Sequence, residues 1–308
     1  MFYRFYLLIN DIMTNLVLLN LMICIMKKLS PIFFTVLFSV SMLAEVSQVE
    51  KTALVKLYKA TNGNQWKVKW DLASPVATWP GVVLQNDKVV ALHLADNNLV
   101  GALPKEICNL VNLQELNLHK NHITGIIPEA IGDLKELKKL DISFNQISGS
   151  IPASICEMVK LESLELYMNV ISGELPYSIG NLKQLQTLSL YNNELVGQIP
   201  SSLYEIDTLK TLLLSSNKLS GKLAHGVVNF KSLENLSLFD NNLEGQVPLE
   251  LEKLRNLKEM NISYNMFSGL VSKNLASLDT LNMTMLNDKG VAVVLEVAKN
   301  NTAIASED

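Results

Sequence analysis

The sequence predicts an α/β solenoid, a curved right-handed superhelix of stacked coils. We expect a parallel β-sheet on its concave face, short 3-10 or helical turns on its convex side and a helical cap at its N-terminal end. Three observations predict this fold. Apolar residues recur every 24 residues from Val89 to Leu281, an asparagine and a glycine recur with the same period, and a helical pattern followed by three tryptophans precedes the first unit. Such a period is typical of repeat proteins, whose units stack because one unit alone cannot bury its apolar face.

Each unit begins with the pattern Leu-x-x-Leu-x-Leu, whose alternation predicts a short strand with apolar side chains facing inward. The second unit has Leu113, Leu116 and Leu118 at these positions. An asparagine follows every strand, where the chain turns. Its amide carries donors and an acceptor, so it can pair with backbone groups that the turn leaves unpaired. We therefore expect a structural ladder of amides, formed by Asn97, Asn121, Asn145, Asn169, Asn193, Asn217, Asn241 and Asn265.

The second half of each unit carries glycine and proline. The glycine stands four residues after the asparagine, where it permits a φ that other residues resist. The residue before the proline, Ile127 in the second unit, is restricted to extended conformations, so a second short strand or extended edge is expected there. The following apolar pair, such as Ile131 with Leu134, has the spacing of a short helix or 3-10 turn.

The whole pattern closely resembles the plant-type leucine-rich repeat of 24 residues, known from plant receptor ectodomains and from secreted bacterial proteins. It covers residues 89–280 as eight units without an insertion. The resemblance implies a binding module without enzymatic activity, which recognises its partner on the concave face of the sheet.

Residues 45–88 are expected to form the N-terminal cap that an exposed solenoid end needs. Ser47 and Glu50 form a capping box that opens a helix, and Gly63 is the expected stop of that helix. Three tryptophans follow, namely Trp66, Trp70 and Trp79. The segment resembles the cap of plant-type repeats, except that the usual cysteine pair is absent. Caps without cysteines resemble those of secreted bacterial relatives, which favours a bacterial source.

Residues 281–308 are expected to form the C-terminal cap. They keep Leu281 and Leu286 but lose the ladder asparagine, because Lys289 stands in its place. An apolar set predicts an amphipathic capping helix in this segment: Val291, Val294, Leu295 and Val297.

The first 44 residues carry a targeting pattern. Residues 26–44 combine two lysines, an apolar stretch and small residues, which are the parts of a secretory signal peptide. Because this signal begins at Met26, residues 1–25 are interpreted as a start assigned too early or an extra N-terminal segment. A retained anchor is the alternative, although Asn10 and Asp11 weaken it as a membrane span. We expect an exported protein that is secreted, periplasmic or on the cell surface, without an integral membrane span in the mature chain.

The composition and motifs exclude several function classes. The formal charge of −4 gives no reason to expect nucleic acid, which requires a basic surface. The sequence has no phosphate-binding loop, no metal-ligand spacing and no nucleophile motif, so we expect neither an enzyme nor a cofactor or metal. Asp141 and Glu165 lie on neighbouring strands, a pairing that glycoside hydrolysis also uses. We interpret them as an ion-attracting patch, because an open face offers nothing to exclude water or shift a pKa.

Cys108 and Cys156 occupy the same place in the first and third units. Two strand steps separate their Cα atoms by on the order of 10 Å, whereas a disulfide needs less than roughly 7 Å. We expect both to be free and partly buried.

The residues between the strand leucines and just after them face the concave surface. Three successive strands carry the candidate ligand-binding residues Asp141, Phe144, Glu165, Tyr167, Met168, Tyr191 and Asn192. Aromatic residues on a polar face are typical of binding hot spots. Stacking that only stabilises the sheet is an equally good interpretation. We expect a monomer that binds a protein, peptide or glycan at this cluster, and a structural or adhesive surface with distributed contacts is the alternative.

Overall fold

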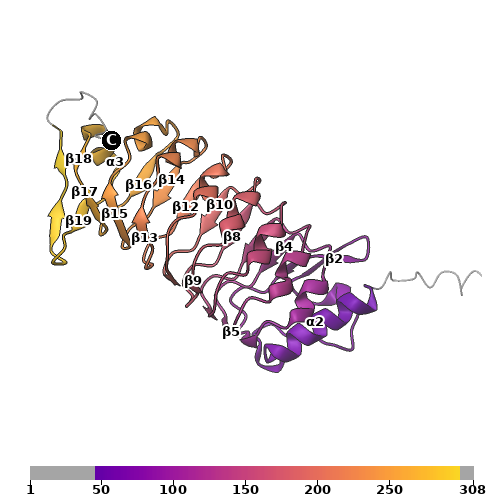
Figure 1. Ribbon diagram of the computed structural model, residues 1–308. Helices are drawn as coiled ribbons and strands as arrows, with labels where there is room; N and C mark the ends of the chain where they lie inside the picture. The colour runs from indigo at the N-terminus through magenta and orange to yellow at the C-terminus, as the bar shows by residue number, and fades with distance from the viewer. Residues whose placement is uncertain (1–45, 299–308) are drawn as a thin grey trace, which may run out of the picture. The chain divides into compact units, whose positions relative to one another are not determined.

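The computed structural model describes residues 46–298. The predicted signal peptide (26–44), the segment before it and the last ten residues lie outside the described residues. The described part is built from coils that lie side by side, from the cap in indigo to the C-terminal strands in yellow (Figure 1).

The main sheet of the described part has nine strands, in the order β1-β2-β4-β6-β8-β10-β12-β14-β16. They are β1 (Val82–Gln85), β2 (Lys88–His93), β4 (Glu115–Asn117), β6 (Lys139–Asp141), β8 (Ser163–Glu165), β10 (Thr187–Ser189), β12 (Thr211–Leu213), β14 (Asn235–Ser237) and β16 (Glu259–Asn261). β1 belongs to the cap and pairs antiparallel with β2. From β2 onward every pair is parallel, and corresponding residues of successive units are opposite each other, as Leu116 and Leu140 are. The eight repeats therefore supply the eight parallel strands.

A second set of short strands follows the first in each coil. They are β3 (Val100–Ala102), β5 (His122–Gly125), β7 (Gln146–Ile147), β9 (Ser172–Gly173), β11 (Glu194–Leu195), β13 (Ser220–Lys222), β15 (Asn242–Gln246) and β17 (Met266–Ser268). The sequence predicts an extended edge at the residue before the proline. These strands lie just upstream, between the ladder asparagine and that residue, and they pair in small parallel sheets.

The other side of each of the first seven coils is a single 3-10 turn. These turns are η3 (Lys105–Asn109), η4 (Glu129–Asp133), η5 (Ala153–Glu157), η6 (Tyr177–Asn181), η7 (Ser201–Glu205), η8 (His225–Asn229) and η9 (Leu249–Lys253). Six of the seven begin directly after a proline that is extended, as Pro128 is before η4. The predicted apolar pair Ile131 and Leu134 is fully buried, so each turn closes the core opposite the strand.

The core is one continuous stack of leucines and isoleucines that runs through all coils. The strand leucines that the repeat predicts to face inward are buried, and Leu164, Leu188 and Leu214 are 0% exposed. Burying each side chain of this kind contributes about 1.5–3 kcal/mol. Because each coil touches only its neighbours, this energy is stored between adjacent coils.

The N-terminal cap consists of α2 (Gln48–Ala60) with η1 (Gly63–Gln65) and η2 (Val76–Thr78). One half of the predicted capping box is present, since Ser47 Oγ accepts from Glu50 N at 3.3 Å. The Glu50 carboxylate accepts from Ser47 Oγ and from Val89 N. The helix ends before Gly63, because the left-handed residue that turns the chain is Asn62, with φ 56°. Gly63 instead lies against the ring of Tyr58, where a Cβ would come within 2.3 Å of Cδ2.

The three cap tryptophans form a buried aromatic stack at the first coil. The ring centroids of Trp66 and Trp70 are 4.9 Å apart, and those of Trp70 and Trp79 are also 4.9 Å apart. The first ladder residue, Asn97, joins the cap to the repeats, because its Oδ1 accepts from Val68 N at 2.7 Å. The cap therefore covers the leucines that the first coil would expose.

The C-terminal end differs from the prediction. A short helix, α3 (Lys273–Leu278), precedes two strands that form a hairpin, β19 (Thr284–Leu286) and β20 (Ala292–Val294). A further strand, β21 (Glu296–Val297), pairs with β18 (Leu270–Val271). The capping helix predicted from Val291, Val294, Leu295 and Val297 is wrong: of these four side chains only Leu295 is buried.

The physical reason is a change of register after the eighth coil. Met283 and Met285 are fully buried there, whereas Leu281 is 41% exposed. The carboxylate of Asp279, itself 4% exposed, accepts from the backbone N–H groups of Ile262, Leu281 and Met283 at 2.7–3.0 Å. Asp279 thus binds the turn to the last coil.

Candidate functional site

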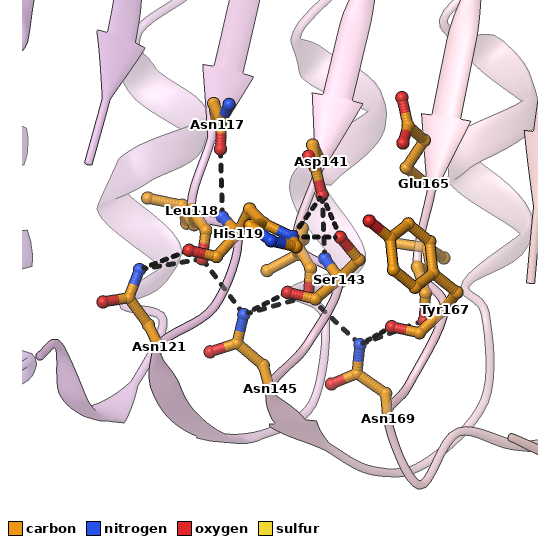
Figure 2. Close-up of polar contacts among 12 residues, drawn as sticks. Asn117, Leu118, His119, Asn121, Asp141, Ser143, Asn145, Glu165, Tyr167 and Asn169 are labelled. Carbon is orange, nitrogen blue, oxygen red and sulfur yellow. Dashed lines mark hydrogen bonds and ion pairs between the residues drawn. The ribbon is translucent and has the colours of Figure 1, made fainter. Parts of the chain in front are cut away.

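The ladder asparagines fix the turn that follows each strand of the main sheet. Asn145 Nδ2 donates to Leu118 O of the preceding coil at 3.0 Å and to Ile142 O of its own coil at 3.0 Å. Its Oδ1 accepts from Ile123 N of the preceding coil at 2.9 Å. Figure 2 shows three such amides side by side below the strands. The predicted ladder is present in this form, and it positions the residues on the sheet face.

A row of rings crosses the sheet face beside the ladder. The rings of Tyr167 and Tyr191 are stacked, with centroids 4.5 Å apart and planes inclined by 10°. The ring centroid of His119 lies 6.1 Å from that of Tyr167 and 5.8 Å from that of Phe144. We call these four residues, Phe144, His119, Tyr167 and Tyr191, the aromatic row. Phe144 is 42% exposed and the other three are half-buried, so the row presents apolar surface to solvent.

Ser143 lies between two members of the row and allows them to meet. His119 and Tyr167 come from coils that are two steps apart, and the strand between them carries Ser143 at the same position. Ser143 is fully buried, so its small side chain leaves space above it for both rings. We call residues at the same position of successive coils a column. The alternation of large, small and large residues along this column brings the rings of His119 and Tyr167 together.

A hydrogen-bonded chain connects His119 to Asp141 through Ser143 (Figure 2). His119 Nδ1 is 2.8 Å from Ser143 Oγ, and Ser143 Oγ donates to Asp141 Oδ1. Ser143 N also donates to Asp141 Oδ1 at 3.0 Å. Because the serine hydroxyl donates to the carboxylate, it accepts from the imidazole, which makes Nδ1 of His119 a donor. This order differs from a nucleophilic triad, in which the histidine lies between the serine and the acid. The chain holds the imidazole in the row.

Glu165 lies directly opposite Asp141 on the neighbouring strand. Burial raises the pKa of the Glu165 carboxyl, and the charge of Asp141 raises it further, against the hydrogen bond from Ser163 and the nearby His119. Ser163 Oγ donates to Glu165 Oε1 at 2.9 Å. The expectation that nothing on this face shifts a pKa is therefore wrong, because the Glu165 carboxyl is partly buried and lies beside the charge of Asp141.

Burial also raises the pKa of the Tyr191 phenol, with smaller contributions from Tyr167 and Glu165. The phenol is thus neutral at physiological pH and acts as a hydrogen-bonding group without charge. Among residues 46–298, no group of three or more His, Cys, Asp or Glu side chains could hold a metal ion. The arrangement offers rings, carboxylates and hydroxyls for binding.

Two family models match the repeats. A model described as leucine-rich repeat region matches residues 164–288, and one described as leucine rich repeat matches residues 87–147 and 111–171. Together with the parallel sheet and the asparagine ladder, these matches decide the family. The chain is a leucine-rich-repeat protein of the plant-type class.

Solved structures, among them two plant receptors, resemble this leucine-rich-repeat protein. The ectodomain of the receptor kinase GASSHO1/SCHENGEN3 from Arabidopsis thaliana, in complex with CASPARIAN STRIP INTEGRITY FACTOR 2, is 28% identical with a TM-score of 0.70, covering 80% of this chain and 30% of that chain. The plant peptide hormone receptor RGFR1 in complex with RGF2 is 30% identical with a TM-score of 0.60, and the match covers 68% of this chain and 32% of that chain. The PEPR1-AtPEP1 structure is 26% identical with a TM-score of 0.64, and the match covers 80% of this chain and 41% of that chain. The leucine-rich-repeat protein thus spans less than half of each.

The structure brings most of the predicted site residues together. Asp141, Glu165, Tyr167 and Tyr191 lie side by side, and Phe144 joins them through His119. The predicted Met168 and Asn192 follow the tyrosines in the turns, where their backbone N–H groups donate to Tyr191 O and Ser215 O at 2.9 Å. The main chain of these two residues thus bonds each coil to the next one.

The sequence reasoning missed His119 and Ser143 as parts of the site. Both stand in the column that contains the tyrosines, and the alternation of ring and small residue was the available signal. It also missed that the next column adopts a left-handed backbone, with φ between 49° and 59°. These left-handed residues are Asp96, Lys120, Phe144, Met168, Asn192, Ser216, Asp240 and Tyr264.

No helix in the part of the leucine-rich-repeat protein that the structure describes is long and apolar enough to cross a membrane. The two repeat cysteines, Cys108 and Cys156, are free, as predicted, and they are more deeply buried than the partial burial that was expected. Burial raises the pKa of the Cys108 thiol to about 11, so it remains a neutral, apolar group in the core.

Proposed function

We propose that this chain is a binding module that takes a protein or peptide ligand across the aromatic row. The observation that carries the proposal is the row itself: four rings with exposed surface lie together on a sheet face whose other positions are mostly small and polar. Rings of this kind supply contact area at little cost in conformational entropy, so they dominate the energy of many interfaces.

The comparisons support a peptide as the ligand. Two of the similar structures are described as plant receptors in complex with RGF2 and with CASPARIAN STRIP INTEGRITY FACTOR 2, and RGFR1 is described as a peptide hormone receptor. A parallel sheet of short strands offers an extended ligand a series of side chains at regular spacing, about 4.8 Å from one coil to the next.

The proposal is tested by removing the stacked pair. The full chain and its Y167S/Y191S variant are compared for capture of phage-displayed random peptides and for binding to a panel of glycans. We expect the variant to lose at least tenfold in affinity for the captured peptides, since hot-spot rings contribute about 2 kcal/mol or more. Unchanged capture by a folded variant, measured by circular dichroism, would show that the row is not the site.

A surface with distributed contacts is the second candidate function. It is favoured by another ring pair on the same face, because Phe239 and Tyr264 have centroids 5.3 Å apart on the last coils. F239S/Y264S is the matched variant that decides between the two. A discrete site predicts that only Y167S/Y191S weakens binding, whereas a distributed surface predicts partial losses of similar size in both variants.

We also propose that the chain is exported, because residues 26–44 carry the signal pattern. The absence of a cysteine pair from the cap supports a bacterial source. Mass spectrometry of the mature N-terminus tests the proposal: a chain that begins near residue 45 supports it, and a chain that retains residues 26–44 contradicts it.

A further inference from the structure

The carboxylates beside the aromatic row lack a permanent positive partner. Asp141 and Glu165 are opposite each other on neighbouring strands, which places their Cα atoms about 4.8 Å apart. The charge of Asp141 acts on the Glu165 carboxyl. The nearest cationic group to Asp141 is His119, whose Nδ1 is 4.0 Å from Oδ1 and which is charged only when protonated.

The lysines on this part of the sheet are already paired. Lys139 precedes Asp141 on the same strand, but its Nζ is 3.0 Å from Glu115 Oε1. Lys120 Nζ is 3.6 Å from Asp96 Oδ2, at the edge of the sheet. The row therefore has an uncompensated negative charge, and burial together with Asp141 raises the pKa of Glu165 in the free protein.

We propose that the peptide taken by the aromatic row presents a lysine or arginine side chain, whose charged group lies between Asp141 and Glu165. This inference rests on the proposed function and specifies the chemistry of its ligand. Tyr167 follows Glu165 by two residues on the same face, so the stem of the cationic side chain lies along the stacked tyrosines. Arginine and lysine stems cover apolar surface in this way, and a cation near a ring face is attracted to it.

The repeat itself supplies a neutral replacement for Asp141. At the same position of their coils, Asn117 Oδ1 accepts from His119 N at 3.0 Å and Asn261 Oδ1 accepts from Ser263 N at 3.1 Å. Asp141 Oδ1 makes the same bond to Ser143 N. D141N therefore keeps the local structure, and E165Q keeps an oxygen that can accept from Ser163 Oγ.

The test uses phage-displayed random dodecapeptides, selected on the full chain at physiological salt. We expect lysine or arginine to be enriched at one position of the selected peptides, and the enrichment to disappear on D141N/E165Q. The matched control is D240N/E259Q, which removes the same charge from the same face, two coils or more away. On the control the enrichment should persist. A general attraction of basic peptides depends only on net charge, so it would fall equally in both variants.

The strongest selected peptide is then synthesised with citrulline in place of the enriched residue. Loss of the cation should weaken binding about tenfold or more, because two partly buried carboxylates lose their charged partner. The inference is overturned by selected peptides without a cationic preference, by an enrichment that survives D141N/E165Q, or by capture of glycans alone. In the first two of these outcomes, the proposed function still stands if capture of peptides depends on Tyr167 and Tyr191. If capture does not depend on these tyrosines, the inference and the proposed function both fail.

Discussion

Asn193 shows how one side chain holds two coils together. Its Nδ2 donates to Leu166 O of the preceding coil and to Leu190 O of its own coil, both at 3.0 Å. Its Oδ1 accepts from Ile171 N at 3.0 Å, and the residue is 9% exposed. No other side chain of this size offers two donors and one acceptor without charge, which explains why the repeat keeps asparagine.

The N193L variant removes these bonds and leaves buried backbone groups without partners. We expect a loss of about 1–3 kcal/mol in the free energy of unfolding, measured by urea denaturation. Asn192→Ser is the control in the same turn, since Ser216 occupies this left-handed position one coil later. An N193L protein as stable as the control would contradict the role assigned to the ladder.

Glu165 predicts a pH dependence of stability. Its pKa is raised in the folded chain, so the folded state binds the proton more tightly than the unfolded state does. Ionisation therefore costs stability as the pH rises through the folded pKa, and the cost is absent below the unfolded value of about 4.3. E165Q should melt like the parent at acidic pH and at a higher temperature near neutral pH. Melting curves at several pH values check this, and a constant difference between the two proteins would contradict it.

At the scale of elements, two pairs of 3-10 turns, η4 with η5 and η6 with η7, approach each other closely enough to require glycine at one position. A Cβ on Gly180 of η6 would lie 2.4 Å from Ser202 O of η7, and Gly132 of η4 has the same relation to Ser154 O of η5. The obstacle is backbone, which cannot move without separating the coils. Glycine at these two positions therefore sets the spacing of adjacent turns.

G180A tests this spacing. Alanine normally favours a helical turn, but here the added methyl group should destabilise the fold by about 1–3 kcal/mol through overpacking. G226A is the comparison, because its Cβ would meet the ring of Tyr204 at 2.9 Å, and a side chain can shift more easily than backbone. The free energy of unfolding, measured by denaturation, should be much lower for G180A than for G226A. The reverse order would show that the turns separate without cost.

The elements that the sequence predicted correctly have one physical property in common: they depend on a pattern repeated in every unit. The inward leucines, the ladder and the proline-initiated turns follow from periodicity and from the chemistry of one residue type. The left-handed column was not predicted, because residues as different as Phe144 and Asp240 adopt it and glycine never marks it. Its N–H groups donate to the next coil, as Phe144 N does to Tyr167 O at 2.9 Å, which offsets the strain.

The candidate site was predictable only as a list of neighbours on a sheet. The register placed Asp141 beside Glu165 and Tyr167 beside Tyr191, as observed. The contact between His119 and Tyr167 depends on how two rings meet above a buried serine. The raised pKa of Glu165 depends on how deeply its carboxyl is buried. Both are consequences of side-chain packing, which periodicity does not specify.

At the scale of the whole molecule, the two ends of the described solenoid are closed by different means. The tryptophan stack of the cap buries the first coil with apolar surface. The last coil is closed by polar bonds to Asp279, which accepts from Ile262 N, Ser263 Oγ and two N–H groups of the following turn. In a linear array each coil is stabilised by its neighbours, so a defect at one end need not spread to the other.

D279A should therefore loosen only the C-terminal coils. Removing the carboxylate leaves several buried donors without an acceptor, at a cost of about 3 kcal/mol. Hydrogen exchange followed by mass spectrometry should show lost protection from β16 onward, with the strands from β2 to β10 as protected as in the parent. N193L provides the contrast, because its defect lies in the middle of the array and should weaken the coils on both sides. Uniform loss of protection in D279A would mean that the array unfolds as one cooperative unit and that its coils are not independently stabilised by their neighbours.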